Sequence, residues 1–341
     1  MSKLTDFLNT LDVKVNDSQN EVISQSTRST LIVPLLHQKA FSISGPDTHK
    51  FLQGQLTCDV DDVFSRGSAL GAHCNIKGHM ISLFRLLSIS NEEVWIRLSE
   101  DIFESAIKSL HKYIVFSKAD INELGDNIAG IGITGPGAEA LIEQWFGHCP
   151  SEDNGCIKAN QGVVVRVPGN RFEIWMQTEE LIALLEQKPD AAGIGSTNDW
   201  ILSEIDAAIP DLRADTQEAF IPQMTNFQIF EGVSFNKGCY TGQEIVTRLQ
   251  HRGQLKKPMY LAEVNSDTAP YPGMLLASEN KPSSGKVVLS APCGEDKYRV
   301  LAVIVKNTAD SQPVYLADNQ AVLELKELPY TLDPQLFMAK N

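Results

Sequence analysis

One strand-and-helix pattern occurs twice in this chain of 341 residues and constrains its fold more than any other feature. The segments Phe41–Pro46 and Gly130–Pro136 are each typical of an apolar strand that ends in Gly-Pro, and a helical pattern follows each one. Proline suits the first turn of a helix because its missing N–H would have no partner there. Ile43 and Ile133 match at the same offset as the glycines and prolines. The repeat predicts two related α+β halves.

Further strands and helices extend these halves. Two hairpins are predicted, one pairing Ile81–Leu87 with Val94–Leu98 and one pairing Gly162–Val167 with Phe172–Met176. Apolar residues at helical spacing predict helices at Leu4–Leu11, Ile102–Tyr113, Thr178–Gln187 and Asp199–Ala208.

The pattern changes near residue 255, where helical periodicity gives way to short strands. The strands are expected at Met259–Val264, Gly285–Leu289, Tyr298–Val305 and Ala321–Leu325. They predict a small all-β domain, either a barrel or a sandwich, with its boundary near Gly253–Pro258. We therefore divide the chain into an N-terminal extension (residues 1–30), an α+β region (31–252), a β domain (253–330) and a tail (331–341).

The charge balance bears on partners. The chain has 29 Lys and Arg against 43 Asp and Glu, a net charge of −14. This balance disfavours a broad surface that tracks phosphates, because nucleic-acid affinity comes largely from Lys and Arg. The first residues lack the apolar core of a secretion signal, and no apolar stretch near the start is long enough to span a bilayer. We expect a cytoplasmic protein with no membrane partner.

Six cysteines are scattered along the chain, and none forms a C-x-x-C pair. In an intracellular protein most such cysteines are small buried thiols. His73, Cys74 and His79 lie close together, but their spacing fits no zinc pattern. We expect no metal site.

The segment Lys237–Glu244 is the one most suggestive of chemistry. Thr241 and Glu244 have the spacing of a capping box, so a helix should start after Thr241. Cys239 would then lie just before a helix N-terminus with Lys237 nearby, and both features favour a thiolate. The alternative is an ordinary glycine-rich turn with a buried cysteine.

The same segment resembles the signature of the YgfZ-type folate-binding proteins, which are described as tRNA-modifying proteins. Four further blocks of the chain resemble that family in the same order: Phe51–Val60, Ala72–Met80, Lys112–Lys118 and Phe220–Asn226. The resemblance extends from about Leu31 to Tyr330.

The resemblance implies an α+β fold similar to the aminomethyltransferase (T protein) of the glycine cleavage system. That fold has ferredoxin-like subdomains around a central folate channel and a C-terminal β-barrel. The implied cofactor is tetrahydrofolate or a derivative, and the implied partners are iron–sulphur proteins or their assembly machinery. Any effect on tRNA methylthiolation would then be indirect, and direct nucleic-acid binding is not expected.

Two positions bear on folate. Trp200 matches a family tryptophan implicated in folate binding, and an indole face can stack on a pteridine ring. The alternative is a core tryptophan. Asp206 falls where aminomethyltransferases carry a pterin-binding Glu, although Ala208 replaces the glycine of that motif. A second family tryptophan would fall near Gln38 and is missing here, and Phe41 could supply an aromatic surface instead.

The leading hypothesis is a tetrahydrofolate-binding protein whose functional thiol is Cys239. Lys237 would help to hold that thiol as thiolate, and Glu244 would cap the following helix. Two glycines, Gly238 and Gly242, would shape the loop. Four further side chains would face ligand or partner: Tyr240, Gln243, Arg248 and Arg252.

Three alternatives stay open. A folate-dependent one-carbon transferase or demethylase is the first, but Ser82 and Leu83 replace the acidic pair of true aminomethyltransferases, so we predict no glycine-cleavage activity. A thiol hydrolase that pairs Cys239 with His251 or His73 is the second, although His251 would lie about 18 Å along the helix. The third is direct tRNA binding through a patch of Arg248, Arg252, Lys256 and Lys257.

Overall fold

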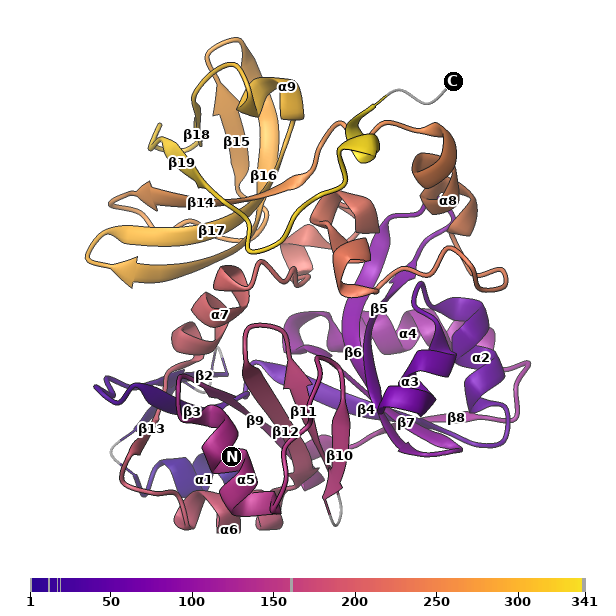
Figure 1. Cartoon of the computed structure of the whole chain (residues 1–341), viewed down its shortest axis with the longest axis vertical. Helices are drawn as coiled ribbons and strands as arrows, with labels where there is room; N and C mark the ends of the chain where they lie inside the picture. Colours follow the sequence, from indigo (N-terminus) through magenta and orange to yellow (C-terminus); the bar gives the residue numbers. More distant parts are fainter. Residues whose placement is uncertain (1, 12, 17, 19, 160–161, 339–341) are drawn as a thin grey trace. The chain divides into compact units, whose positions relative to one another are not determined.

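The computed structural model describes residues 2–11, 13–16, 18, 20–159 and 162–338, with Arg252 as backbone only. The chain forms two compact units (Figure 1). The first comprises Met1–Leu52, Val60–Leu70 and Phe84–Trp200, and the second Gln53–Asp59, Gly71–Leu83 and Ile201–Asn341. Two short segments from the N-terminal part of the sequence thus belong to the second unit. The four-part division of the sequence stays a prediction.

A five-stranded sheet has the order β5-β6-β7-β4-β8. Its strands are β4 (Gln38–Ser44), β5 (Ser68–Cys74), β6 (Met80–Ser90), β7 (Glu93–Ser99) and β8 (Asp120–Glu123). The predicted hairpin is confirmed, since β6 pairs antiparallel with β7. The accompanying helices are α2 (Thr48–Gln55), α3 (Val60–Arg66) and α4 (Phe103–Ile114), with a 3-10 turn η1 (Glu100–Ile102) before α4.

A six-stranded sheet in the first unit has the order β10-β11-β12-β9-β3-β13. Its strands are β3 (Thr30–Pro34), β9 (Ile128–Thr134), β10 (Cys156–Ala159), β11 (Gly162–Val167), β12 (Arg171–Gln177) and β13 (Ala192–Ile194). The second predicted hairpin is β11 with β12. The remaining elements are α1 (Lys3–Leu8), β1 (Lys14–Asn16), β2 (Glu21–Ile23), η2 (Gly125–Asn127), α5 (Ala138–Phe146), α6 (Thr178–Glu186) and α7 (Thr197–Asp206).

The repeated strand-and-helix unit is confirmed as β4–α2 and β9–α5. The glycine in each junction has a left-handed backbone, with φ of 138° at Gly45 and 101° at Gly135. A Cβ on Gly135 would lie 2.0 Å from the carbonyl oxygen of Ser29. Only glycine therefore allows this close approach of two backbones, which explains why the same dipeptide closes both strands.

A buried ionic network connects strands of the two sheets in the first unit. Glu173 on β12 forms a bidentate pair with Arg97 on β7, whose Nε lies 2.9 Å from the carboxylate. Arg85 on β6 lies 3.7 Å from the same carboxylate and donates to the Asn154 side chain at 2.7 Å. Trp175 Nε1 donates to Glu173 at 3.0 Å. These polar groups are buried but paired, as a protein interior requires.

The C-terminal part of the second unit is a curled six-stranded half-barrel (Figure 1) with the order β18-β15-β16-β17-β14-β19. Its strands are β14 (Met259–Asn265), β15 (Leu275–Ser278), β16 (Lys281–Gly294), β17 (Lys297–Ile304), β18 (Val314–Leu316) and β19 (Leu323–Lys326). The expected all-β character is confirmed, and a bridge between Tyr315 and Val322 brings the two edges of the sheet together. The other elements of this unit are α8 (Gln243–Arg252), α9 (Lys306–Ala309), η3 (Ala214–Thr216), η4 (Pro222–Thr225), η5 (Phe227–Phe230) and η6 (Pro334–Phe337).

Among the helices of the described residues, none combines the length and the apolar character needed to cross a membrane.

Candidate functional site

The loop that precedes α8 presents an exposed thiol. Cys239 is a free, exposed cysteine, whereas Cys58 and Cys74 of the same unit are buried. The cysteine is therefore not buried, as the alternative of an ordinary turn supposed, and whether its thiol is functional stays a prediction. Burial raises the pKa of the Cys74 thiol to about 12, so that thiol stays protonated and inert. Cys239 is the accessible one of these three thiols.

Lys237 holds this loop in place through hydrogen bonds to two backbone carbonyls. Its ammonium donates to the carbonyl oxygens of Leu56 at 2.9 Å and Cys58 at 2.6 Å, and it lies 5.4 Å from the centre of the Tyr240 ring. Two backbone acceptors and an aromatic face thus hold the charge in a fixed place. The ammonium has a structural role here, and its action on the thiol stays a prediction.

The start of α8 is set by a close backbone approach. Gly242 has φ of 84°, and a Cβ there would lie 2.5 Å from the carbonyl oxygen of Asn75. Gly242 is the N-cap of α8, and no side chain caps the helix. The predicted capping box is wrong, because the hydroxyl of Thr241 lies 3.4 Å from the amide oxygen of Gln55 and Glu244 is exposed. The left-handed glycine replaces the extended N-cap backbone that a capping box needs.

Tyr240, the residue after Cys239 in this loop, is buried, and its hydroxyl has no hydrogen-bond partner. Burial, with smaller effects of the Cys74 and Cys58 thiols, raises the pKa of Tyr240 well above its usual range. The hydroxyl is therefore neutral at physiological pH and can donate a proton in a hydrogen bond.

Three amide side chains around η4 and η5 also keep unpaired, buried polar atoms. Gln223 donates to the carbonyl oxygen of Val246 at 2.6 Å, but its own oxygen has no partner. Asn226 donates to Met259 at 3.0 Å, and its oxygen is likewise unpaired. Both amide atoms of Gln228 lack partners. Gln223 and Asn226 belong to a block that resembles the family, which was the only sequence signal for them.

Trp200 lies in the core of the first unit with no exposed surface. The guanidinium of Arg171 lies 4.7 Å from the centre of its ring, and a Cβ on Gly132 would come within 2.4 Å of the indole. Its environment is that of the core tryptophan weighed above. Its expected contact with folate stays a prediction, and no indole face is open in this conformation.

Asp206 ends α7 and forms an ion pair with Arg299, which also donates to Glu263 at 2.7 Å. Two residues later Ala208 has φ of 51°, the left-handed region that glycine prefers. The alanine therefore adopts a backbone typical of the glycine that the resemblance to aminomethyltransferases leads one to expect here. Its carbonyl oxygen accepts a hydrogen bond from the Tyr330 hydroxyl at 3.2 Å.

The remaining predicted side chains on α8 point to different surroundings. The side-chain amide nitrogen of Gln243 donates to the carbonyl oxygen of Gly238 at 3.5 Å, and Arg248 is exposed. The ring of His251 packs edge-on against Phe235, at 6.5 Å between centres. Lys256 and Lys257 are exposed beyond the helix, and the side chain of Arg252 lies outside the described part of the structure.

Comparison with known proteins identifies the family. No family model matches the chain. It is 32% identical over 297 residues to a protein from Yersinia enterocolitica named tRNA-modifying protein YgfZ, covering 85% of this chain and 89% of that protein. It is 33% identical to the protein of the same name from Photobacterium profundum, over 86% and 89% of the two chains. The chain belongs to the YgfZ family.

The fold of this YgfZ-family chain is that of an aminomethyltransferase. It matches the glycine cleavage system aminomethyltransferase T from Bartonella henselae with a TM-score of 0.72 and 14% identity, over 92% of this chain and 88% of that one. The predicted fold class is confirmed, with the barrel present as a curled half-barrel.

Two positions that the resemblance singled out are buried in this YgfZ-family chain. Ser82 and Leu83, which the resemblance aligns with the acidic pair of aminomethyltransferases, are buried on β6. Phe41 is fully buried and packs edge-on against Phe103 at 5.8 Å, so the expectation that it supplies an open aromatic surface near Gln38 is wrong. Within the described residues, no group of three or more His, Cys, Asp or Glu is arranged to hold a metal ion.

Proposed function

We propose that this protein binds tetrahydrofolate or a derivative in the cytoplasm. It supports the assembly or maintenance of iron–sulphur enzymes, and thereby the methylthiolation of some tRNAs. The observation that carries the proposal is the exposed Cys239 thiol on a loop with a fixed backbone. Lys237 fixes one end of that loop through two carbonyls, and Gly242 fixes the other against Asn75. Such an exposed thiol is accessible to a partner protein.

The second unit has groups that fit a folate. A pterin presents a row of N–H donors and ring acceptors, and unpaired buried polar groups gain most from such partners. Gln223, Asn226, Gln228 and Tyr240 each keep at least one buried polar atom without a partner. We propose that they hold the pterin, together with Asp206, Gln243 and Arg248. The contact of Trp200 with folate stays a prediction from the family resemblance.

An enzymatic alternative is a folate-dependent one-carbon transferase or demethylase. The buried Ser82 and Leu83 cannot move a proton as a carboxylate does. We therefore favour an accessory or regulatory role, with iron–sulphur proteins or their assembly machinery as partners and no direct contact with tRNA.

Titration with tetrahydrofolate tests the cofactor. Wild type should show a saturable change in tryptophan fluorescence, and Trp200→Phe should show a smaller change because one buried indole is lost. Absence of saturable binding to wild type by fluorescence and by equilibrium dialysis would remove folate from the proposal.

Complementation tests the thiol. In cells that lack the native protein, Cys239→Ala should fail to restore tRNA methylthiolation, while the protein accumulates to normal levels. Cys293→Ala is the matched control, because Cys293 is a partly exposed cysteine on the half-barrel strand β16. Full rescue by Cys239→Ala would contradict a functional role of this thiol.

A further inference from the structure

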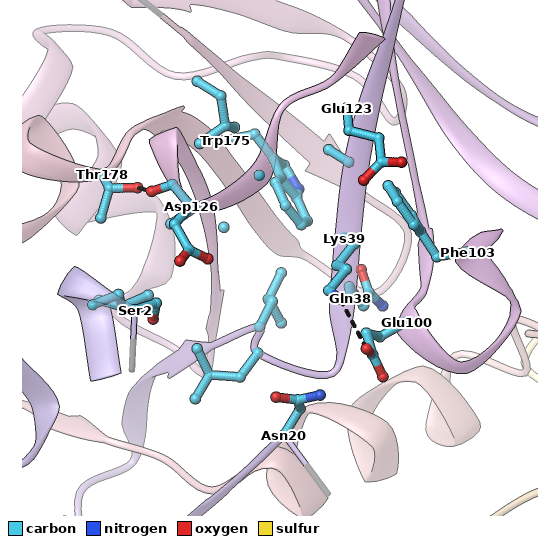
Figure 2. Close-up of a pocket in the computed structure, with 18 of the residues that line it drawn as sticks. Ser2, Asn20, Gln38, Lys39, Glu100, Phe103, Glu123, Asp126, Trp175 and Thr178 are labelled. Atoms are coloured by element: carbon cyan, nitrogen blue, oxygen red, sulfur yellow. Dashed lines mark hydrogen bonds and ion pairs between the residues drawn. The ribbon is translucent and has the colours of Figure 1, made fainter. Parts of the chain in front are cut away.

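A cavity of about 750 Å³ lies within the first unit, outside the residues proposed for folate. Its walls come from the start of β4, from η1 and the first turn of α4, from η2, and from the N-terminal segment around α1 (Figure 2). The volume falls in the range of pockets that enclose small molecules.

The walls of this cavity are strongly acidic. Lys39 is the single lysine among the described residues of its lining, and that ammonium is paired with Glu100 at 2.8 Å. Five carboxylates line it: Glu100, Asp101, Glu104, Glu123 and Asp126. The N-termini of α4 and α6 also reach the wall, and each contributes about half a positive charge. An excess of negative charge remains after both are counted.

Gln38 supplies an independent sign of a missing partner. It lines the cavity, and only 4% of the residue's surface is exposed. Neither the nitrogen nor the oxygen of its side-chain amide has a hydrogen-bond partner. A buried amide without partners keeps its full desolvation cost, which a bound polar group would offset. In Figure 2 the Trp175 ring and the Asp126 carboxylate point toward the centre of the same space.

We propose that this cavity binds a small organic cation, with an ammonium group on a short apolar stem. The N–H groups of the ammonium would donate to the carboxylates of Glu123 and Asp126. The stem would pack on the apolar wall formed by Leu35, Leu36 and Ala40, which belong to the same lining. A second polar group of the ligand would pair with the Gln38 amide.

The charge separates this site from the folate proposal. Folates are anionic through their glutamate carboxylates, and an acidic cavity repels them. A metal ion is also a poor fit, because no three metal-binding side chains are brought together within the described residues.

The proposal is tested by calorimetric titration of the full chain with putrescine and, in parallel, with 1,4-butanediol. The two compounds share a four-carbon stem and differ in charge. Putrescine should bind saturably at one site at physiological salt, and the diol should not bind. Putrescine without saturable binding, or a diol that binds equally well, would overturn the proposal.

Variants locate the site. Asp126→Asn and Glu123→Gln should each weaken putrescine binding by about fivefold, the upper range for one partly exposed ion pair, and Gln38→Met should weaken it as well. Glu186→Gln is the matched control, because Glu186 is an exposed carboxylate at the opposite end of α6 and lies outside the cavity. Equal weakening by Glu186→Gln would show diffuse attraction to an acidic protein and contradict a site. Competitive displacement by tetrahydrofolate would contradict a separate site while supporting folate binding.

Discussion

At the scale of single residues, the buried carboxylate of Glu173 is the group on which the stability of the fold depends most clearly. Burial alone would raise its pKa, but Arg97 and Arg85 together with hydrogen bonds from Arg97 and Trp175 outweigh burial, and the net shift is downward. Burial also lowers the pKa of the Arg85 guanidinium to about 10, so that side chain is still charged at neutral pH. The fold therefore depends on an ionised carboxylate in its interior.

We predict that Glu173→Gln lowers the free energy of unfolding by about 3–5 kcal/mol at pH 7, because two buried guanidinium groups lose their counter-charge. A depressed pKa stabilises the fold above the unfolded-state pKa of about 4.3, and this contribution disappears as pH falls through the folded-state value. Urea unfolding from pH 7 to pH 3 should therefore show the gap between wild type and variant shrinking in acid. A constant gap would contradict the assigned ionisation.

A second residue-scale prediction concerns Tyr240. Tyr240→Phe removes an unpaired buried hydroxyl, so the unliganded protein should be as stable as wild type or slightly more stable. Tetrahydrofolate should bind about fivefold more weakly if the hydroxyl donates to it, since a hydrogen bond contributes about 1 kcal/mol. Thermal unfolding and the folate titration together check this. Unchanged folate affinity would remove Tyr240 from the proposed site.

The sequence pattern identified the loop around Cys239, but not the unpaired amide side chains around η4 and η5. Cys239 and Lys237 stood out because glycines and a helix start flanked them. Gln223 lies in a block that resembles the family and Gln228 lies just after it, but neither could be identified as unpaired, because whether an amide is left unpaired depends on which backbone groups the fold brings to it. Trp200 shows the reverse limit, since a motif match carries no information on whether the ring is covered by Arg171.

At the scale of elements, the local sequence pattern predicts whether a segment is a helix or a strand. Where the element ends is decided by contacts with residues distant in the sequence. The start of α8 is the clearest example, because contact with Asn75 selects a left-handed glycine over the Thr241 capping box. The strands β15 and β18 were missed because they have only four and three residues and become strands by pairing with each other and with β16. Such short segments carry too little periodicity to be recognised.

This view of α8 predicts different effects for two glycines in one loop. Gly242→Ala should destabilise the protein by about 1–3 kcal/mol, because it combines an unfavourable φ with a collision against the Asn75 carbonyl. Gly238→Ala should be nearly neutral, since nothing lies within 4 Å of the added Cβ. Urea unfolding of both variants provides the comparison. Equal destabilisation would show that the loop needs flexibility rather than close approach.

At the scale of the whole molecule, the net charge of −14 remains the main constraint on partners. Arg248, Lys256 and Lys257 are exposed on and just after α8. Three or four cations release few counterions from a nucleic acid, and the surrounding excess of carboxylates opposes the approach of a polyanion. The charge supports the proposed indirect role in tRNA modification over direct binding.

We therefore predict that total tRNA is not retarded by this protein in a gel-shift assay at about 0.15 M salt, a typical physiological ionic strength. A basic tRNA-binding protein run in parallel shows that the tRNA is competent. The triple variant Arg248→Glu, Lys256→Glu, Lys257→Glu should behave as wild type in this assay. A retarded band that the triple variant loses, and that weakens steeply with added salt, would contradict the indirect role and place a tRNA-binding surface beside α8.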